Sequence, residues 1–354
     1  MKTHKYILFL LAATVLACGK ESTLLPPPEA STAVSDATGT VNISLGGPFS
    51  ATRTANPAST VESGCTRWAL WIFDAAGDGV VYGTGGAGES IRKTVLVGSY
   101  TVIAVVNYPL SMVPASITTK TELQNRVMQL ADNAAGSMLM YGETPLELAS
   151  GQTVSCTVDV RRLVAKVGVK KVSVAFENPY LAAKTTVLEA IYLTNLYRTC
   201  RLGEDYSAGE LLPGEAAWYN VMGWRPAEDA IPAVDALVGD LGIQATLTPS
   251  APYTTPHYFY AFPNAMPAGS DNHDAVWSKR STRLVLQVAV GSNTYYYQVQ
   301  VPAMGRNRVY MAEEIILKKA GSLDPEQDIP GAVDVVFSAA GINWDYDVNV
   351  AEIS

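Results

Sequence analysis

The sequence of 354 residues contains little of what enzymes and nucleic-acid-binding proteins use. It has three histidines, and it contains no Gly-x-Ser-x-Gly, His-Glu-x-x-His, P-loop or Rossmann glycine pattern. Lys and Arg number 25 against 33 Asp and Glu, a formal net charge of -8. Binding to a phosphate backbone depends on cationic side chains that displace counterions, so this balance argues against nucleic acid as a partner. We expect neither an enzyme nor a bound cofactor.

Metal sites and disulfide frameworks also lack the necessary residues. The four cysteines, at positions 18, 65, 156 and 200, show no Cys-x-x-Cys spacing. A single bridge between Cys65 and Cys156 stays open, but we expect Cys65, Cys156 and Cys200 to pack as small apolar side chains. The segment 271–274 has oxygen ligands for calcium without the glycine turn or the closing glutamate of an EF-hand, so we expect a solvated loop and no metal.

The apolar run at residues 6–17 is too short to span a bilayer, which needs about 20 residues. It follows Lys2 and Lys5, and residues 1–17 therefore predict a signal peptide. The run ends in Val-Leu-Ala-Cys, which resembles a bacterial lipobox and predicts acylation of Cys18, palmitate included, after the signal is cut. Several acyl chains on one residue would anchor the protein stably. The alternative is an ordinary signal peptide followed by an incidental cysteine.

Residues 18–39 are rich in Pro, Ser and Thr and show no periodicity, so they predict a tether between the lipid and the folded chain. Beyond them, apolar and polar residues alternate with the period of a strand. We divide the remainder into an N-terminal β-sandwich domain over 40–163 and a C-terminal one over 164–354. The strands expected in the first domain are 41–45, 68–74, 94–97, 100–106 and 153–160, and those in the second are 188–195, 258–262, 283–290, 295–301 and 309–317.

The predicted fold is all-β. Sequential strands joined by tight turns favour antiparallel sheets. The alternation over 161–176 is longer than one strand, so we expect the last strand of the first domain to run almost directly into the first strand of the second.

One minor helix is expected in the first domain. Thr119 and Glu122 have the spacing of a capping box, and Leu123, Val127 and Leu130 follow at helical spacing.

The C-terminal segment 331–354 carries two more alternating runs. Their apolar faces must cover the edge of a sheet, either in this molecule or in the next, because terminal segments otherwise fray. The residues of these faces are Val333, Val335 and Phe337 in the first run, and Trp344, Tyr346, Val348 and Val350 in the second.

Taken together, these stretches resemble the fimbrillin family, the lipoprotein pilins of type V pili. The resemblance rests on the lipobox and tether and on the order and spacing of several segments through nearly the whole chain. These segments are 71–79, 98–107, 140–143, 162–167, 191–195, 260–264, 295–299, 305–310 and 321–325.

The resemblance implies two transthyretin-like antiparallel β-sandwich domains in tandem and a precursor that travels to the outer membrane as a lipoprotein. An arginine-specific protease then cuts the loop after the first strand, which maps here to the Arg53–Thr54 bond. The first strand, with Val41, Ile43 and Leu45, leaves a groove. A strand donated by another subunit fills that groove, and the implied donor residues are those of the two C-terminal runs.

The expected function is therefore a structural pilin of a cell-surface fimbria. Its expected partners are other pilin subunits, in a homopolymer with tip and anchor subunits, the processing protease, and the outer membrane before maturation. The alternatives are a tip or anchor subunit of the same fimbria and a glycan-binding surface lipoprotein, to which Trp218, Trp224 and Trp277 would contribute aromatic surface.

Overall fold

The computed structural model describes residues 37–47, 62, 64–203, 218–219, 237–266, 281–325 and 327–344, and for 218–219 and 338–343 it describes the backbone alone. The described chain is built almost entirely of strands, which confirms the all-β prediction. Six of the predicted site residues lie outside the described part, so their roles stay predictions. They are Cys18, Arg53, Thr54, Tyr346, Val348 and Val350.

A five-stranded antiparallel sheet forms much of the N-terminal half, in the order β3-β2-β5-β7-β9. Every residue of β2 is buried, because its run of six large and small apolar side chains has no polar face. The strands are β2 (Trp68–Phe73), β3 (Gly79–Gly85), β5 (Gly98–Val106), β7 (Met140–Leu148) and β9 (Arg161–Arg162).

A three-stranded sheet has β1 (Thr38–Gly46) at its centre. β1 pairs antiparallel with β4 (Ile91–Leu96) and parallel with β8 (Thr153–Asp159). The parallel pair departs from the antiparallel sheets expected from sequence. A tight hairpin forces antiparallel pairing, whereas β1 and β8 are separated by more than 100 residues and are free of that constraint.

Two further sheets make up the C-terminal half. In one, β21 (Arg308–Leu317) pairs antiparallel with β22 (Val333–Asn343) and parallel with β10 (Ala165–Val169) and β11 (Val172–Val174), and β18 (His257–Ala261) follows β10. In the other, the order is β16-β12-β19-β20, with β17 also on β12. The strands of this second sheet are β12 (Thr186–Thr194), β16 (Gly239–Asp240), β17 (Ala245–Leu247), β19 (Arg283–Val290) and β20 (Asn293–Gln300).

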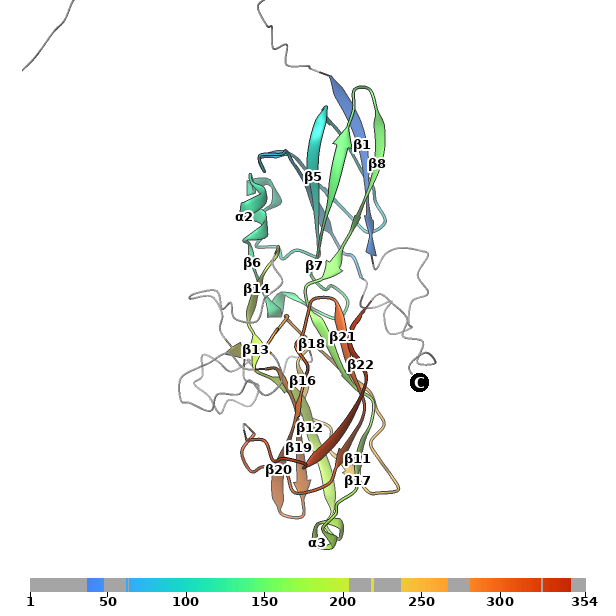
Figure 1. The fold of residues 1–354 in the computed structure, drawn as a ribbon, viewed down its shortest axis with the longest axis vertical. Helices are drawn as coiled ribbons and strands as arrows, with labels where there is room; N and C mark the ends of the chain where they lie inside the picture. Colours follow the sequence, from blue (N-terminus) through green and yellow to red (C-terminus); the bar gives the residue numbers. More distant parts are fainter. Residues whose placement is uncertain are drawn as a thin grey trace, which may run out of the picture. The chain divides into compact units, whose positions relative to one another are not determined.

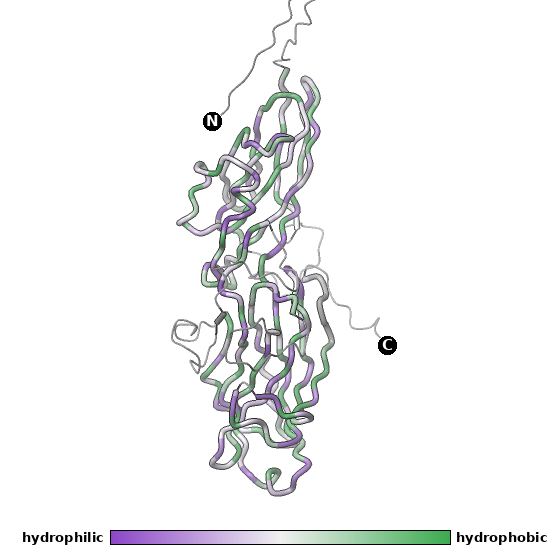
Figure 2. Tube along the Cα trace, turned by 60° about the vertical axis from the view of Figure 1, so that its left-hand side comes forward, coloured by the Kyte–Doolittle hydropathy of each residue, from purple (hydrophilic) through white to green (hydrophobic). Residues whose placement is uncertain are grey.

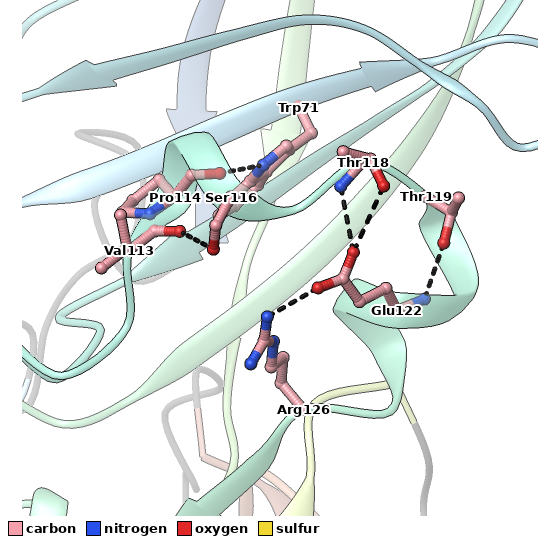
Figure 3. Close-up of polar contacts among 8 residues, drawn as sticks. All are labelled: Trp71, Val113, Pro114, Ser116, Thr118, Thr119, Glu122 and Arg126. Atoms are coloured by element: carbon pink, nitrogen blue, oxygen red, sulfur yellow. Dashed lines mark hydrogen bonds and ion pairs between the residues drawn. The ribbon is translucent and has the colours of Figure 1, made fainter.

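The predicted helix is much shorter than its apolar spacing indicates. Helix α2 covers only Lys120–Gln124, and the next residues form β6 (Val127–Gln129) and a 3-10 turn (Leu130–Asp132). β6 leaves the helical path because it pairs with β14 (Thr199–Arg201) from the other half of the chain. The hydroxyl of Thr119 accepts the backbone N–H of Glu122, as a capping residue does, but the Glu122 carboxylate accepts from Thr118 instead (Figure 3).

Short elements complete the described chain. β13 (Leu196–Tyr197) pairs with β15 (Trp218–Tyr219). The remaining helical turns are Pro114–Ser116 and α3 (Pro179–Ala182). No helix among the described residues is both long and apolar enough to cross a membrane.

The chain passes from β9 in one half to β10 in the other through Leu163 and Val164 alone, both fully buried. This is the direct passage that the alternation over 161–176 predicts. The buried apolar side chains form one continuous core that includes residues of both halves. Figure 2 shows apolar and polar segments alternating along the strands.

Candidate functional site

The slot occupied by β1 is the first part of the candidate site. Val41 and Ile43 point into the core and are fully buried, and Leu45 is half-buried against the same core. On the opposite face, the hydroxyls of Thr40 and Ser44 lie near those of Thr94 and Thr157. Figure 1 shows β1 running alongside β8 in the N-terminal half. β1 therefore fills the centre of its sheet with two apolar anchors and a polar outer face.

Cys156 of β8 lies directly beside β1, in register with Ile43. Its side chain is buried, and this burial raises the pKa of the thiol. Cys65, Cys156 and Cys200 are all free thiols, and the latter two are buried as expected from sequence, whereas Cys65 is half-exposed.

The C-terminal strand β22 is the second part. It pairs with β21 at one edge of its sheet, as Figure 1 also shows. Val333, Val335 and Phe337 are half-buried against the core, whereas Val336 on the other face is exposed. The first of the two predicted C-terminal runs thus covers an edge of its own molecule.

A buried polar cluster joins the two ends of the site. Glu62, on the segment between β1 and β2, is 3% exposed and forms an ion pair of 2.7 Å with Lys166 of β10. Its carboxylate also accepts the hydroxyl of Tyr260 at 2.6 Å and the indole N–H of Trp344 at 2.9 Å. All three donors are themselves buried. One carboxylate thus contacts β10, β18 and the residue that follows β22.

Aromatic rings and cations surround this carboxylate. The Tyr260 and Trp344 rings are stacked at 5.7 Å between centroids, and the Arg162 guanidinium lies 4.4 Å from the Trp344 ring centroid. Arg162 also donates to the backbone carbonyl of Glu62 at 3.2 Å and to the Asn307 side chain at 3.0 Å. The Trp344 backbone N–H donates to the Asn307 carbonyl at 2.9 Å.

Burial shifts the pKa values of two members of this cluster, Lys166 and Tyr260. It lowers the pKa of Lys166, an effect that the Glu62 carboxylate opposes and the Arg162 guanidinium reinforces. Burial also raises the pKa of Tyr260, and the adjacent Glu62 carboxylate adds to that shift. The cluster therefore depends on Glu62 as the anion that balances two buried cations.

A cavity of about 740 Å³ lies between the two halves of the chain. Charged side chains of both signs line it, so it favours no single ligand charge. They are Glu143, Asp159, Arg161, Arg306 and Arg308.

The other candidate residues from the sequence are a possible calcium loop and three tryptophans. Among the described residues, no group of three His, Cys, Asp or Glu side chains could hold a metal ion. The segment 271–274, Trp224 and Trp277 lie outside the described residues, and Trp218 is described by its backbone alone.

Sequence reasoning missed the Glu62 cluster. Arg162 and Lys166 are four positions apart in a strand-like run, and an even spacing places them on one face with apolar Val164 between them. Two cations on an otherwise apolar face indicate a buried anionic partner. Nothing in the sequence marks Glu62 as that partner, because it lies 104 residues away.

Comparison with known proteins finds one family model that matches part of the chain. Residues 38–195 match the family model described as fimbrillin-A associated anchor proteins Mfa1 and Mfa2. A search of curated proteins finds no match.

Solved structures match over most of the chain. A protein from Bacteroides eggerthii described as a candidate cell adhesion protein is 17% identical, with a TM-score of 0.61 over 86% of this chain and 96% of that one. A fimbrilin from Porphyromonas gingivalis W83 is 13% identical, with a TM-score of 0.57 over 85% and 97%. The tip fimbrial protein Mfa3 of Porphyromonas gingivalis is 14% identical, with a TM-score of 0.51 over 86% and 99%.

These solved structures show that the chain shares its fold with fimbrial and cell adhesion proteins. The family-model match over residues 38–195 and the structural matches confirm the resemblance to the fimbrillin family that the sequence shows. The named relatives are fimbrial and adhesion proteins rather than enzymes.

Proposed function

We propose that the protein is a structural subunit of a cell-surface fimbria, exported as an outer-membrane lipoprotein acylated on Cys18, matured by cleavage after Arg53 and polymerised by donor-strand exchange. The observation that carries this proposal is the position of β1 between β4 and β8. A cut after Arg53 separates β1 from β2 in the covalent chain, so β1 remains held by noncovalent contacts alone.

Loss of β1 would leave a groove that suits another strand. Two neighbouring strands would each lose a row of backbone partners, and the cavities of Val41 and Ile43 would open. Burying each of these side chains contributes about 1.5 to 3 kcal/mol. A strand with apolar residues at alternate positions could restore both contributions, since strand addition combines main-chain hydrogen bonds with side-chain pockets.

The proposed donor is the C-terminal segment 331–354. Its alternate apolar residues have the period that a strand slot requires, and Val333, Val335 and Phe337 already use that period against β21. A donor at one end and an acceptor slot elsewhere make a head-to-tail contact. Such a contact does not close on itself, so it generates a filament.

The experiment compares the wild-type chain with Arg53→Ala after brief treatment with an arginine-specific protease. We expect a new N-terminus at Thr54 and an SDS-resistant ladder of multimers for the wild type, and neither for Arg53→Ala. Arg92→Ala, which removes another arginine from β4, serves as the matched control and should still be cut after Arg53. A wild-type product that is cut there and stays monomeric would refute polymerisation by strand exchange.

A second candidate is an anchor or tip subunit of the same fimbria. It is favoured by the match of residues 38–195 to a family described as anchor proteins, and by the fold shared with a tip fimbrial protein. The same protease treatment, repeated with processed stalk subunits added, separates the two candidates. A chain that resists cleavage after Arg53, yet joins a ladder formed by processed subunits as its terminal member, is an end subunit rather than a stalk pilin.

A further inference from the structure

Trp344 is held by several contacts at the described end of the C-terminal segment. Its indole N–H donates to Glu62, its ring contacts Tyr260 and Arg162, and its backbone N–H donates to the Asn307 carbonyl. The side chain is 7% exposed. These contacts join a residue near the C-terminus to one that lies 282 positions earlier in the chain.

The strand that leads to Trp344 is less regularly held. β22 pairs with β21 in unbroken register from Val333 to Val336, whereas irregularities interrupt the ladder between Val336 and Asn343. Each bulge leaves a residue outside the ladder. Separation of β22 from its C-terminal end would therefore break the Trp344 contacts first and meet a weakened ladder next.

We propose that Glu62 and Trp344 form a latch that holds the C-terminal segment closed in the unassembled subunit. The latch is defined by the hydrogen bond from the Trp344 indole to the Glu62 carboxylate and by the side chains of Lys166, Tyr260 and Arg162 around it. Glu62 holds Trp344 by an N–H donated to a charged acceptor, which is stronger than a neutral hydrogen bond. Release of Trp344 also removes an aromatic ring from two buried cations.

The position of Glu62 couples this latch to processing, and this step rests on the proposed function. Glu62 lies nine residues after Arg53 and six before Trp68. In the uncut chain, Glu62 is connected covalently to β1 on one side and to β2 on the other. A cut after Arg53 would break the connection to β1, so Glu62 would be tethered through β2 alone. Cleavage after Arg53 would thereby loosen the donor segment through the contact between Glu62 and Trp344.

The test is hydrogen–deuterium exchange of the full mature chain, read in peptides that cover 333–344. In Trp344→Phe, which keeps an aromatic ring and loses the indole N–H, we expect exchange in these peptides to rise by about tenfold or more. Trp71→Phe is the matched control. It also removes a buried indole N–H, here donated to the Pro114 carbonyl at 3.1 Å, but lies in the N-terminal half (Figure 3). Equal exchange of the 333–344 peptides in Trp344→Phe and Trp71→Phe would overturn the latch.

Glu62→Gln tests the other side of the contact, with Glu122→Gln as its control, because Glu122 is a surface carboxylate paired with Arg126 in the same chain. Exchange in β2 peptides serves as the internal reference for global unfolding. An increase in exchange confined to peptides of 333–344 supports the latch. An equal increase in the β2 peptides would show that Glu62→Gln unfolds the whole protein, and would overturn the role of Glu62 in the latch. Trp344→Phe, the milder change, keeps the proposal testable in that case.

Cleavage supplies the last arm. Exchange in 333–344 should rise when the wild type is cut after Arg53, and should rise little further in Trp344→Phe. Exchange that is unchanged by the cut would overturn the coupling. The latch and the proposed function can be refuted independently. If the cut chain forms a ladder while Trp344→Phe and Glu62→Gln exchange as the wild type does in 333–344, the latch is refuted and the proposed function stands. Variants that open 333–344 in a chain that never polymerises remove the proposed function and keep the latch.

Discussion

Local opening of β1 can be measured through Cys156, because the thiol lies beside Ile43 and is 6% exposed. Ile43→Ala removes a fully buried side chain, and such changes cost about 2 to 5 kcal/mol. If this cost falls on the pairing of β1, the open state becomes about 30 to 4,000 times more populated, at about 1.4 kcal/mol for each factor of ten. Alkylation of Cys156 should accelerate by a similar factor.

The assay is alkylation with excess N-ethylmaleimide, followed by peptide mapping, so that each cysteine is read separately. Cys200 is the internal standard, since it is fully buried and belongs to β14, which pairs with β6 and not with β1. Asn42→Ala on the outward face of β1 is the matched variant and should leave the rate within about threefold, as surface substitutions cost about 0.5 kcal/mol or less.

Two results would refute this reasoning. An unchanged Cys156 rate in Ile43→Ala would mean that β1 does not open as a unit. Equal acceleration at Cys156 and Cys200 would mean that the whole fold opens and that β1 has no independent release.

Three further predictions concern the scaffold around the site. Thr119→Ala removes the oxygen that caps α2 and should lower the free energy of unfolding by about 1 kcal/mol in urea titration, whereas Thr121→Ala, inside the helix, should cost less; equal losses would contradict the capping role. Gly142→Ala should destabilise the fold, because a Cβ there would lie 2.3 Å from the Asp159 carbonyl oxygen, while Gly136→Ala, with open space around it, should not; a thermal melt distinguishes them. The hydrogen bond from Thr118 and the Arg126 guanidinium hold the pKa of Glu122 below its ordinary value of 4.5. Ionised Glu122 therefore stabilises the fold above pH 4.5, and this stabilisation is lost as pH falls through the lower pKa of the folded state. Glu122→Gln should reduce the loss of stability between about pH 6 and 3, and an unaltered pH profile would disprove this assignment.

Much of the fold could be predicted because alternation is a local property. The runs that became β5, β12, β19, β20 and β21 have apolar side chains at the period of a strand, and each one is a strand in the structure. The direct passage from β9 to β10 also followed from the sequence, since no Gly- or Pro-rich linker interrupts 161–176. Burial of β2 is equally local, because six consecutive residues offer no face to water.

The tertiary structure alone decided the rest, and the reason is distance along the chain. Val127 and Leu130 have helical spacing, but pairing of β6 with residues 199–201 ends the helix before them. β1 and β8 run parallel because nothing short connects them. Glu62 becomes a buried partner of Lys166 and Trp344 only when three segments far apart in sequence meet, and a buried carboxylate in such a place is stable only with those partners in position.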